Sequence, residues 1–91
     1  MGQDESLVYF EAYPNPASAS VQIDMLLSEA AELKISLHDL SGKQVAQICD
    51  KPLGQGFQHI NWLRPANLPA GLYLLKVQAG SQTALKKLIF N

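Results

Sequence analysis

The chain has 91 residues, which is the size of one domain and too short for two. Hydrophobic residues make up 47% of it, an ordinary share for a globular protein and too high for a disordered one. Its 7 basic and 8 acidic residues give a formal net charge of -1, which argues against nucleic acid as a partner, because nucleic-acid-binding proteins carry a basic face. No apolar run approaches the ~20 residues of a membrane-spanning helix, so no transmembrane segment is expected.

Residues 1–6 (MGQDES) are polar and acidic, unlike a secretory signal peptide, in which a basic start precedes an apolar stretch. They are expected to be a linker remnant, an initiator Met-Gly joined to a fragment of a longer protein, and the domain is expected to span residues 7–91. A targeting signal of the parent protein would then lie upstream. The single cysteine, Cys49, can form no internal disulfide, and it is expected to be buried as a small hydrophobic side chain.

Short apolar runs separated by turn residues follow one another along the chain. Residues 20–26 and 33–38 alternate apolar and polar side chains, which is the pattern of half-buried strands, whereas the alternation in residues 44–49 is blurred. Only residues 27–32 have a helix-forming composition, and they are too few for more than a turn. Seven runs are expected to be strands: residues 7–12, 20–26, 33–38, 44–49, 57–62, 72–77 and 83–91.

This succession of short strands, with turn chemistry between them and no long helix, favours an all-β domain. The expected fold is an immunoglobulin-like β-sandwich of about seven short antiparallel strands, and a small barrel is the alternative. The description "immunoglobulin-like" refers to architecture alone, because the Cys…Trp…Cys pattern of antibody domains is absent.

The turns between the expected strands contain residues suited to them. Asp39 can accept hydrogen bonds from backbone amides further along its turn, and Gly42 can adopt a positive φ, which are the two requirements of a short hairpin loop. The segment Pro-Ala-Gly at residues 69–71 begins the strand that carries Tyr73. A second turn then returns the chain into a basic and apolar run that ends at the C-terminus.

Groups that could support catalysis or hold a metal are sparse. His38 falls out of phase with the apolar stripe of its strand, so it is expected to be exposed, and its neighbour Asp39 points to the opposite face, too badly placed for a nucleophilic site with Cys49. No Cys or His pair has metal-ligand spacing, and no loop is of calcium-binding type. Residues 54–56 (GQG) precede no helix that would bind phosphate. The sequence therefore predicts no enzyme, no cofactor and no metal site.

Aromatic side chains leave a binding function open. Trp62 and Tyr73 are expected mainly in the core, and Ile60 is expected to be buried beside Trp62, because a small domain needs its aromatic residues for packing. Tyr9 and Tyr13 could equally lie on the surface and stack against sugars, as in a carbohydrate-binding module. A passive fibronectin-like spacer is the remaining alternative.

Four pieces of the sequence, in this order, resemble one family. They are YPNPAS at residues 13–18, HDLSGKQV at 38–45, NLPAGLY at 67–73 and KKLI at 86–89. Together they resemble the C-terminal sorting domain of type IX secretion system cargo proteins, also called the Por secretion system sorting domain. The similarity runs over nearly the whole chain, from about residue 13 to residue 91.

The resemblance implies a non-catalytic, immunoglobulin-like domain at the C-terminal end of secreted proteins of Gram-negative bacteria. Such a domain directs a cargo that has folded in the periplasm through the outer-membrane translocon, and a cell-surface sortase then commonly removes it. The implied location is the periplasm in transit and afterwards the outer-membrane surface or the medium. The implied partners are the translocon and the sortase.

The matching residues fall into two groups. The first is expected to shape turns and packing: Pro14, Asn15, Pro16, Asp39, Gly42, Lys43, Leu68, Pro69, Gly71 and Tyr73. The second contains the candidates for recognition by the translocon or the sortase: Lys86, Lys87, Leu88, Ile89, Phe90 and Asn91. Members of the family often end with a basic residue, whereas this chain ends with an asparagine.

A physical mechanism of recognition follows from the terminal position of the last strand. At a sheet edge, such a strand presents a row of unpaired backbone groups that can pair with another strand. A receptor strand could add there, with Lys86 and Lys87 giving specificity. The same edge could support a weak dimer.

Overall fold

The computed structural model describes residues 6–91, and every regular element in this part is a β-strand. None of its described segments is a helix with the length and apolarity that crossing a membrane requires. Residues 1–5 of the expected linker remnant lie outside the described residues, while Ser6 is buried. The strands are β1 (Leu7–Tyr13), β2 (Ser20–Leu27), β3 (Ala31–His38), β4 (Gln44–Leu53), β5 (Gly56–Leu63), β6 (Gly71–Ala79) and β7 (Gln82–Phe90).

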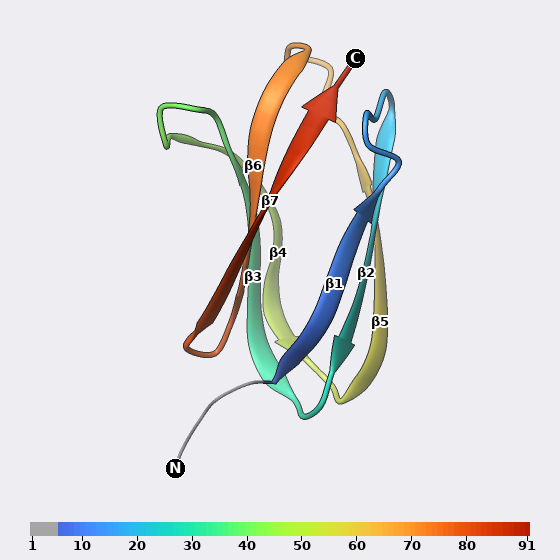
Figure 1. The fold of residues 1–91 in the computed structure, drawn as a ribbon, viewed down its shortest axis with the longest axis vertical. Helices are drawn as coiled ribbons and strands as arrows, with labels where there is room; N and C mark the ends of the chain where they lie inside the picture. The colour runs from blue at the N-terminus through green and yellow to red at the C-terminus, as the bar shows by residue number, and fades with distance from the viewer. Residues whose placement is uncertain (1–5) are drawn as a thin grey trace.

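The seven strands form two antiparallel sheets that pack face to face (Figure 1). Sheet A has the order β1-β2-β5, and sheet B has the order β4-β3-β6-β7. The prediction of an all-β sandwich with seven antiparallel strands is confirmed. Among the described strands, none of one sheet pairs with a strand of the other, which excludes the alternative of a closed barrel. The narrower description, immunoglobulin-like, stays a prediction.

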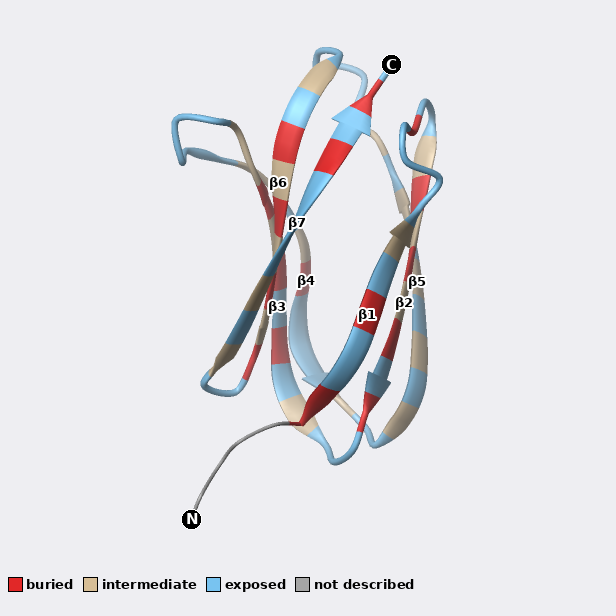
Figure 2. Cartoon of the chain, viewed as in Figure 1, coloured by how far each residue is buried: buried red, intermediate tan, exposed pale blue. Residues whose placement is uncertain are grey.

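The core lies between the sheets and follows the two-residue period of the strands. Alternate residues of a strand point to opposite faces, so each central strand sends one set of apolar side chains inward. Figure 2 shows this as separate buried bands along β2, β3 and β6. Cys49 is buried, as predicted. The side chains predicted to form the inner stripes of β2 and β3 are all fully buried: Val21, Ile23, Met25, Leu33, Ile35 and Leu37.

Strand β4 explains why its alternation looked blurred. Its pairing with β3 shifts register twice, between Ile35 and Ser36 and between Leu37 and His38. Each extra residue in a ladder reverses the inward and outward phase of the residues that follow it, so no single stripe runs along β4. Pro52, expected in a loop, lies within this strand and is tolerated because β4 is an edge strand of sheet B.

Two further expectations need correction. The segment 27–32, expected to be a turn, gives its first residue to β2 and its last two to β3, so that only residues 28–30 connect the strands. Ile60 and Trp62, expected in the core, are only partly buried and pack against it from the edge strand β5. An edge strand is covered on one side only, which leaves its inward side chains partly open.

Candidate functional site

The terminal strand β7 lies at the edge of sheet B, as the sequence predicts, because β6 is its only neighbour among the seven described strands. In an antiparallel pair, every second residue of an edge strand directs its backbone N–H and C=O away from its neighbour. Ile89 is one of these residues, since both of its backbone groups bond to the loop between β1 and β2. By the same period, Thr83, Leu85 and Lys87 also face outward.

The loop between β1 and β2 covers the outer edge of the last residues of β7. The side-chain oxygen of Asn15 accepts a hydrogen bond from the N–H of Ile89 at 3.0 Å, and its side-chain nitrogen donates to the carbonyl of Lys87 at 3.0 Å. Ala17 continues this pairing. Its N–H donates to the carbonyl of Ile89 at 2.8 Å, and its carbonyl accepts from the N–H of Asn91 at 2.8 Å. The loop thus acts as a short parallel strand beside β7.

The prediction of an unpaired edge along the whole terminal strand is therefore wrong for residues 87–91. The groups that close this edge come from a segment more than 70 residues earlier in the chain, so the terminal run itself gives no sign of them. For the part of the chain that the structure describes, the outward groups of Thr83 and Leu85 and the outward N–H of Lys87 have no hydrogen-bond partner. An added strand, or a second copy of the domain, would find an open edge only there.

Arg64 joins three segments at the same end of the sandwich. Its Nη1 donates to the carbonyl oxygens of Ser18 at 2.9 Å and Asn91 at 2.8 Å, and its Nε donates to the carbonyl of Leu68 at 3.1 Å. Its guanidinium carbon lies 4.9 Å from the centroid of the Phe90 ring, which is a cation–π distance. Sequence reasoning missed this residue. The available signal was that Arg64 is the only arginine in a chain whose other basic residues are lysines.

Phe90 anchors the terminal strand in the core. Its side chain is almost completely buried, with the Tyr73 ring 5.7 Å away in an edge-to-face arrangement and the Trp62 ring at 6.3 Å. The Tyr73 hydroxyl donates to the carbonyl of Pro69 at 2.6 Å, which ties the start of β6 to the same cluster. Gly71 supplies the turn with a φ of 151°, which other residues rarely adopt. Phe90, expected among the recognition residues, is thus held inside the fold.

We call Asn15, Ala17 and Arg64 the terminal clamp. These residues hold the end of β7 against the β1–β2 loop and the segment before β6, and these segments lie at one end of the sandwich in Figure 1. Three of the four sequence pieces singled out above meet here, namely residues 13–18, 67–73 and the terminal run. These pieces, which are distant in the sequence, therefore share one structural role, which is to fix the path of the last strand.

The two terminal lysines point to opposite faces of sheet B. Lys86 has the inward phase of Leu88, and its ammonium lies 5.4 Å from the centroid of the Phe10 ring on the facing sheet. Lys87 has the outward phase and is exposed together with Ile89. Leu88 is fully buried. Of the six predicted recognition residues, Leu88 and Phe90 are buried and the other four are exposed, with Lys86 on the inward face of the strand and Lys87 and Ile89 on its outward face.

The fourth sequence piece forms a separate turn between β3 and β4. One carboxylate oxygen of Asp39 accepts hydrogen bonds from the N–H of Ser41 at 2.9 Å, its hydroxyl at 2.6 Å and the N–H of Lys43 at 3.0 Å. These bonds lower the pKa of Asp39, the hydroxyl of Ser41 first and the backbone of Lys43 next. Gly42 has a φ of 92°. The predicted turn chemistry of Asp39 and Gly42 is confirmed.

The outer face of sheet A carries a polar cluster around Asp24. The Tyr13 hydroxyl donates to Oδ2 of Asp24 at 2.8 Å, and Nδ1 of His59 lies 2.5 Å from Oδ1. The hydrogen bond from His59, followed by that from Tyr13, lowers the pKa of Asp24. The hydrogen bond that Tyr13 donates to Asp24 raises the pKa of Tyr13, because ionisation of the hydroxyl would remove the donated proton.

An apolar row crosses the three strands of sheet A next to this cluster. Tyr9, Leu26 and Phe57 are neighbours in the strand register, and all three are exposed. The rings of Tyr9 and Phe57 lie 6.3 Å apart at 60°. A shallow hollow of about 300 Å³ lies between Phe57 and the polar cluster. Tyr9 and Tyr13, whose placement the sequence left open, are thus both on the surface.

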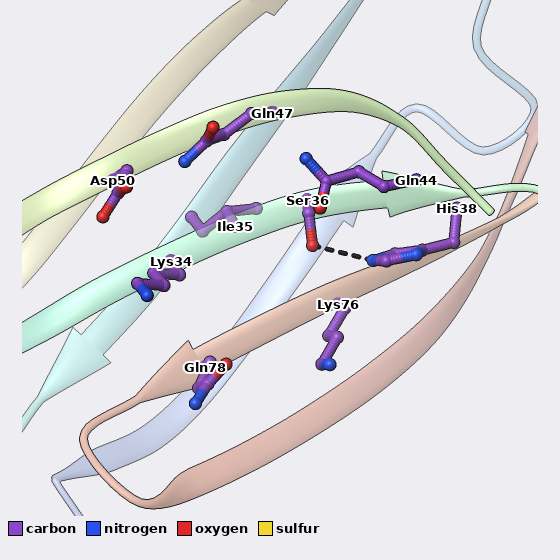
Figure 3. Close-up of a pocket in the computed structure, with 9 residues that line it drawn as sticks. All are labelled: Lys34, Ile35, Ser36, His38, Gln44, Gln47, Asp50, Lys76 and Gln78. Atoms are coloured by element: carbon purple, nitrogen blue, oxygen red, sulfur yellow. Dashed lines mark hydrogen bonds between the residues drawn. The ribbon is translucent and has the colours of Figure 1, made fainter. Parts of the chain in front are cut away.

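The outer face of sheet B carries a polar hollow of about 210 Å³ (Figure 3). Lys34 and Lys76 approach it from β3 and β6, and Gln47 and Asp50 from β4. His38 closes one end and is half-buried rather than exposed, since its Nε2 lies 2.9 Å from the Ser36 hydroxyl.

No group of three or more potential metal ligands occurs within residues 6–91.

The family model described as the secretion system C-terminal sorting domain, the sorting tail of the type IX system, matches residues 11–91. No curated protein matches the chain at a significant level. The matched region begins within β1 and contains strands β2 to β7, the terminal clamp and the Asp39 turn. The chain belongs to the family of type IX secretion system C-terminal sorting domains.

Proposed function

We propose that this domain is a non-catalytic secretion signal, which directs a periplasmic cargo protein through the type IX translocon to the cell surface, where a sortase removes it. The observation that carries the proposal is the terminal clamp. Three of the sequence pieces that identify the family take part in holding the terminal strand in one position. Holding the exposed side chains of this strand in one position suits a recognition element, because a rigid epitope loses less entropy when it binds.

The recognition residues are the outward members of the terminal run. Lys87, Ile89 and Asn91 present their side chains to a partner, whereas Leu88 and Phe90 are buried and support the strand from behind. Lys86 is exposed, and its ammonium lies over the Phe10 ring of the facing sheet. In this proposal the partner recognises the exposed side chains, and the buried side chains hold them in position.

The direct test is a fusion in a host with a working type IX system. Residues 1–91 are placed at the C-terminus of a periplasmic reporter that carries its own signal peptide, and surface exposure of the reporter is measured by protease accessibility in intact cells. We expect the reporter on the surface in this host and in the periplasm of a translocon-deficient strain. A reporter that stays in the periplasm of both strains would refute the sorting function.

The same fusion separates a signal from a passive spacer. Placing the domain between two reporter modules leaves its fold intact but removes its free C-terminus, so a terminal signal should fail there. Equal export of a reporter with the domain in either position and of a reporter without the domain would support the spacer instead.

A deletion of residues 87–91 would not be a clean test of recognition. It would also remove Leu88 and Phe90, and the loss of a buried phenylalanine alone costs about 3–5 kcal/mol. The double variant Lys87→Ala/Ile89→Ser changes only outward side chains. We expect it to reduce export while thermal unfolding stays close to that of the unchanged domain, with Lys51→Ala as the control. Unchanged export would remove these two residues from the recognition surface.

A second candidate function, glycan binding, is favoured by the apolar row on sheet A. Exposed rings at Tyr9 and Phe57 offer stacking faces for a pyranose, and Asp24 and His59 beside them offer hydrogen bonds to its hydroxyls. Binding to a panel of bacterial polysaccharides, lost in Phe57→Ala and retained in Leu63→Ala, would support it. Equal binding by both variants would refute it.

A further inference from the structure

The outer face of sheet B contains two adjoining hollows. The polar hollow of Figure 3 and a second, more apolar hollow of about 370 Å³ share His38 and Lys76. Leu74 and Leu85 line the second hollow. A polar recess and an apolar recess therefore meet at Lys76, on the same hairpin that carries the terminal strand.

Lys76 is a half-buried cation that forms no ion pair within residues 6–91. In the strand register its neighbours are Ser36 on β3 and Leu85 on β7, and neither is acidic. The ion pairs of residues 6–91 do not include Lys76, and no hydrogen bond or ring contact of its ammonium occurs there. By contrast, Lys34 has Asp50 opposite it in the register. Strands β6 and β7 carry three lysines and no acidic residue, and the nearest carboxylate that lines the polar hollow is Asp50 of β4.

Apolar side chains surround this charge in a regular pattern. On the outer face of the hairpin, Leu72 lies opposite Ile89, Leu74 opposite Lys87, and Lys76 opposite Leu85. Leu85 is 60% exposed, and Leu72 and Ile89 on the same face are exposed as well. The hairpin therefore presents leucine, isoleucine and lysine side chains in a mixed surface with one sign of charge.

We propose that this face binds an acidic and apolar segment of a protein of the export machinery; the proposal rests on the sorting function given above. A carboxylate of the segment pairs with Lys76 in the shared part of the hollows, and an apolar side chain lies between Leu74 and Leu85. In an extended segment, residues two positions apart are separated by about 7 Å, which is also the spacing of Leu74 and Lys76 along β6. Charge complementarity selects this occupant.

Other modes of binding are less suited to this site. Strand addition along residues 87–91 is blocked, because Asn15 and Ala17 already occupy that edge. A second copy of the domain would bring its own Lys76 and Lys87 against the first pair, and like charges facing each other are unfavourable. A partner with carboxylates avoids both difficulties.

The proposal is tested first by charge reversal. In the surface-export assay, Lys76→Glu is compared with Lys51→Glu, which makes the same charge change on an exposed lysine that lines neither hollow. We expect export to fall about tenfold or more for Lys76→Glu and to be unchanged for Lys51→Glu, at equal thermal stability. Equal export of the two folded variants would overturn this proposal and leave the sorting function standing. Failure of the unchanged domain to be exported would refute the sorting function and the proposal with it.

The chemistry of the partner is tested by photo-crosslinking in exporting cells. A photoreactive residue is placed at Leu85, and in a control at Leu63, which is equally accessible on the outer face of sheet A. We expect an adduct at Leu85 but not at Leu63, to a protein segment that contains Asp or Glu within two residues of an apolar side chain. An adduct to lipid or lipopolysaccharide, an equal adduct at Leu63, or no adduct at Leu85 would overturn the proposal.

Discussion

The Asn15 side chain pairs with the backbone of the terminal strand as a neighbouring strand would, accepting from the N–H of Ile89 and donating to the carbonyl of Lys87, each at 3.0 Å. An amide side chain has one acceptor and one donor group, so it can satisfy both backbone groups at once. Ala17 repeats the pattern two residues later with its own backbone. The last residues of β7 therefore have hydrogen-bond partners on both sides, as an interior strand would, although they lie at the edge of sheet B.

Arg64 should be more important to stability than its place outside the main core suggests. Arg64→Lys keeps the positive charge but cannot reproduce the Nε and Nη1 bonds together, so carbonyls of Leu68 and Asn91 compete for one ammonium. We expect the free energy of unfolding in urea to fall by about 1–3 kcal/mol. Lys51→Ala, an exposed control, should change it by less than about 0.5 kcal/mol. Equal stability of the two variants would contradict the role assigned to Arg64.

The buried hydroxyl of Tyr73 should be worth more than the exposed hydroxyl of Tyr13. Tyr73→Phe leaves the ring beside Phe90 but deprives the carbonyl of Pro69 of its 2.6 Å bond inside a packed cluster. We expect a loss of about 1 kcal/mol in the free energy of unfolding. Tyr13→Phe, which also removes one hydroxyl bond, should cost less because water replaces it. The reverse order in chemical denaturation would show that the Pro69 contact does not stabilise the hairpin.

Acid should weaken the fold through Asp24 and Asp39. Hydrogen bonds lower the pKa of both carboxyls in the folded state, below the ordinary value of 3.8, so folding favours their charged forms. The resulting stability is complete above that ordinary value and is lost as the pH falls through the lowered pKa values. We expect the midpoint of urea unfolding to drop as the pH falls below the ordinary value of 3.8 and through the lowered pKa values. The drop should be smaller in Asp24→Asn/Asp39→Asn, and an identical drop in that variant would assign it to other groups.

Sequence reasoning was accurate where the determinants are local. The Asp39 turn was predicted because its acceptor, its amides and Gly42 lie within five residues, and the stripes of β2 and β3 because period-2 alternation is visible in any one strand. The sequence also placed the terminal strand at a sheet edge. Alternation alone, however, would have shown that Lys86 and Lys87 point to opposite faces.

The closure of the terminal edge could not be predicted in this way. It depends on Asn15 and Arg64 meeting residues far away in the sequence, and a single chain carries no local sign of such contacts. The register shifts of β4 could not be predicted from the sequence either, because a bulge changes which residues face inward without changing their types. Long-range pairing, rather than strand propensity, thus decided what the terminal strand leaves open.

Amide hydrogen exchange along β7 tests the closed edge most directly. In the folded domain we expect the outward amide of Ile89 to exchange at least about tenfold more slowly than the outward amide of Leu85, which has no acceptor among residues 6–91. In Asn15→Ala, the Ile89 amide should approach the rate of Leu85, while the amide of Asn91 stays protected by the carbonyl of Ala17. Equal rates for Ile89 and Leu85 in the unchanged domain would contradict the account, because the terminal strand would then be open along its whole length.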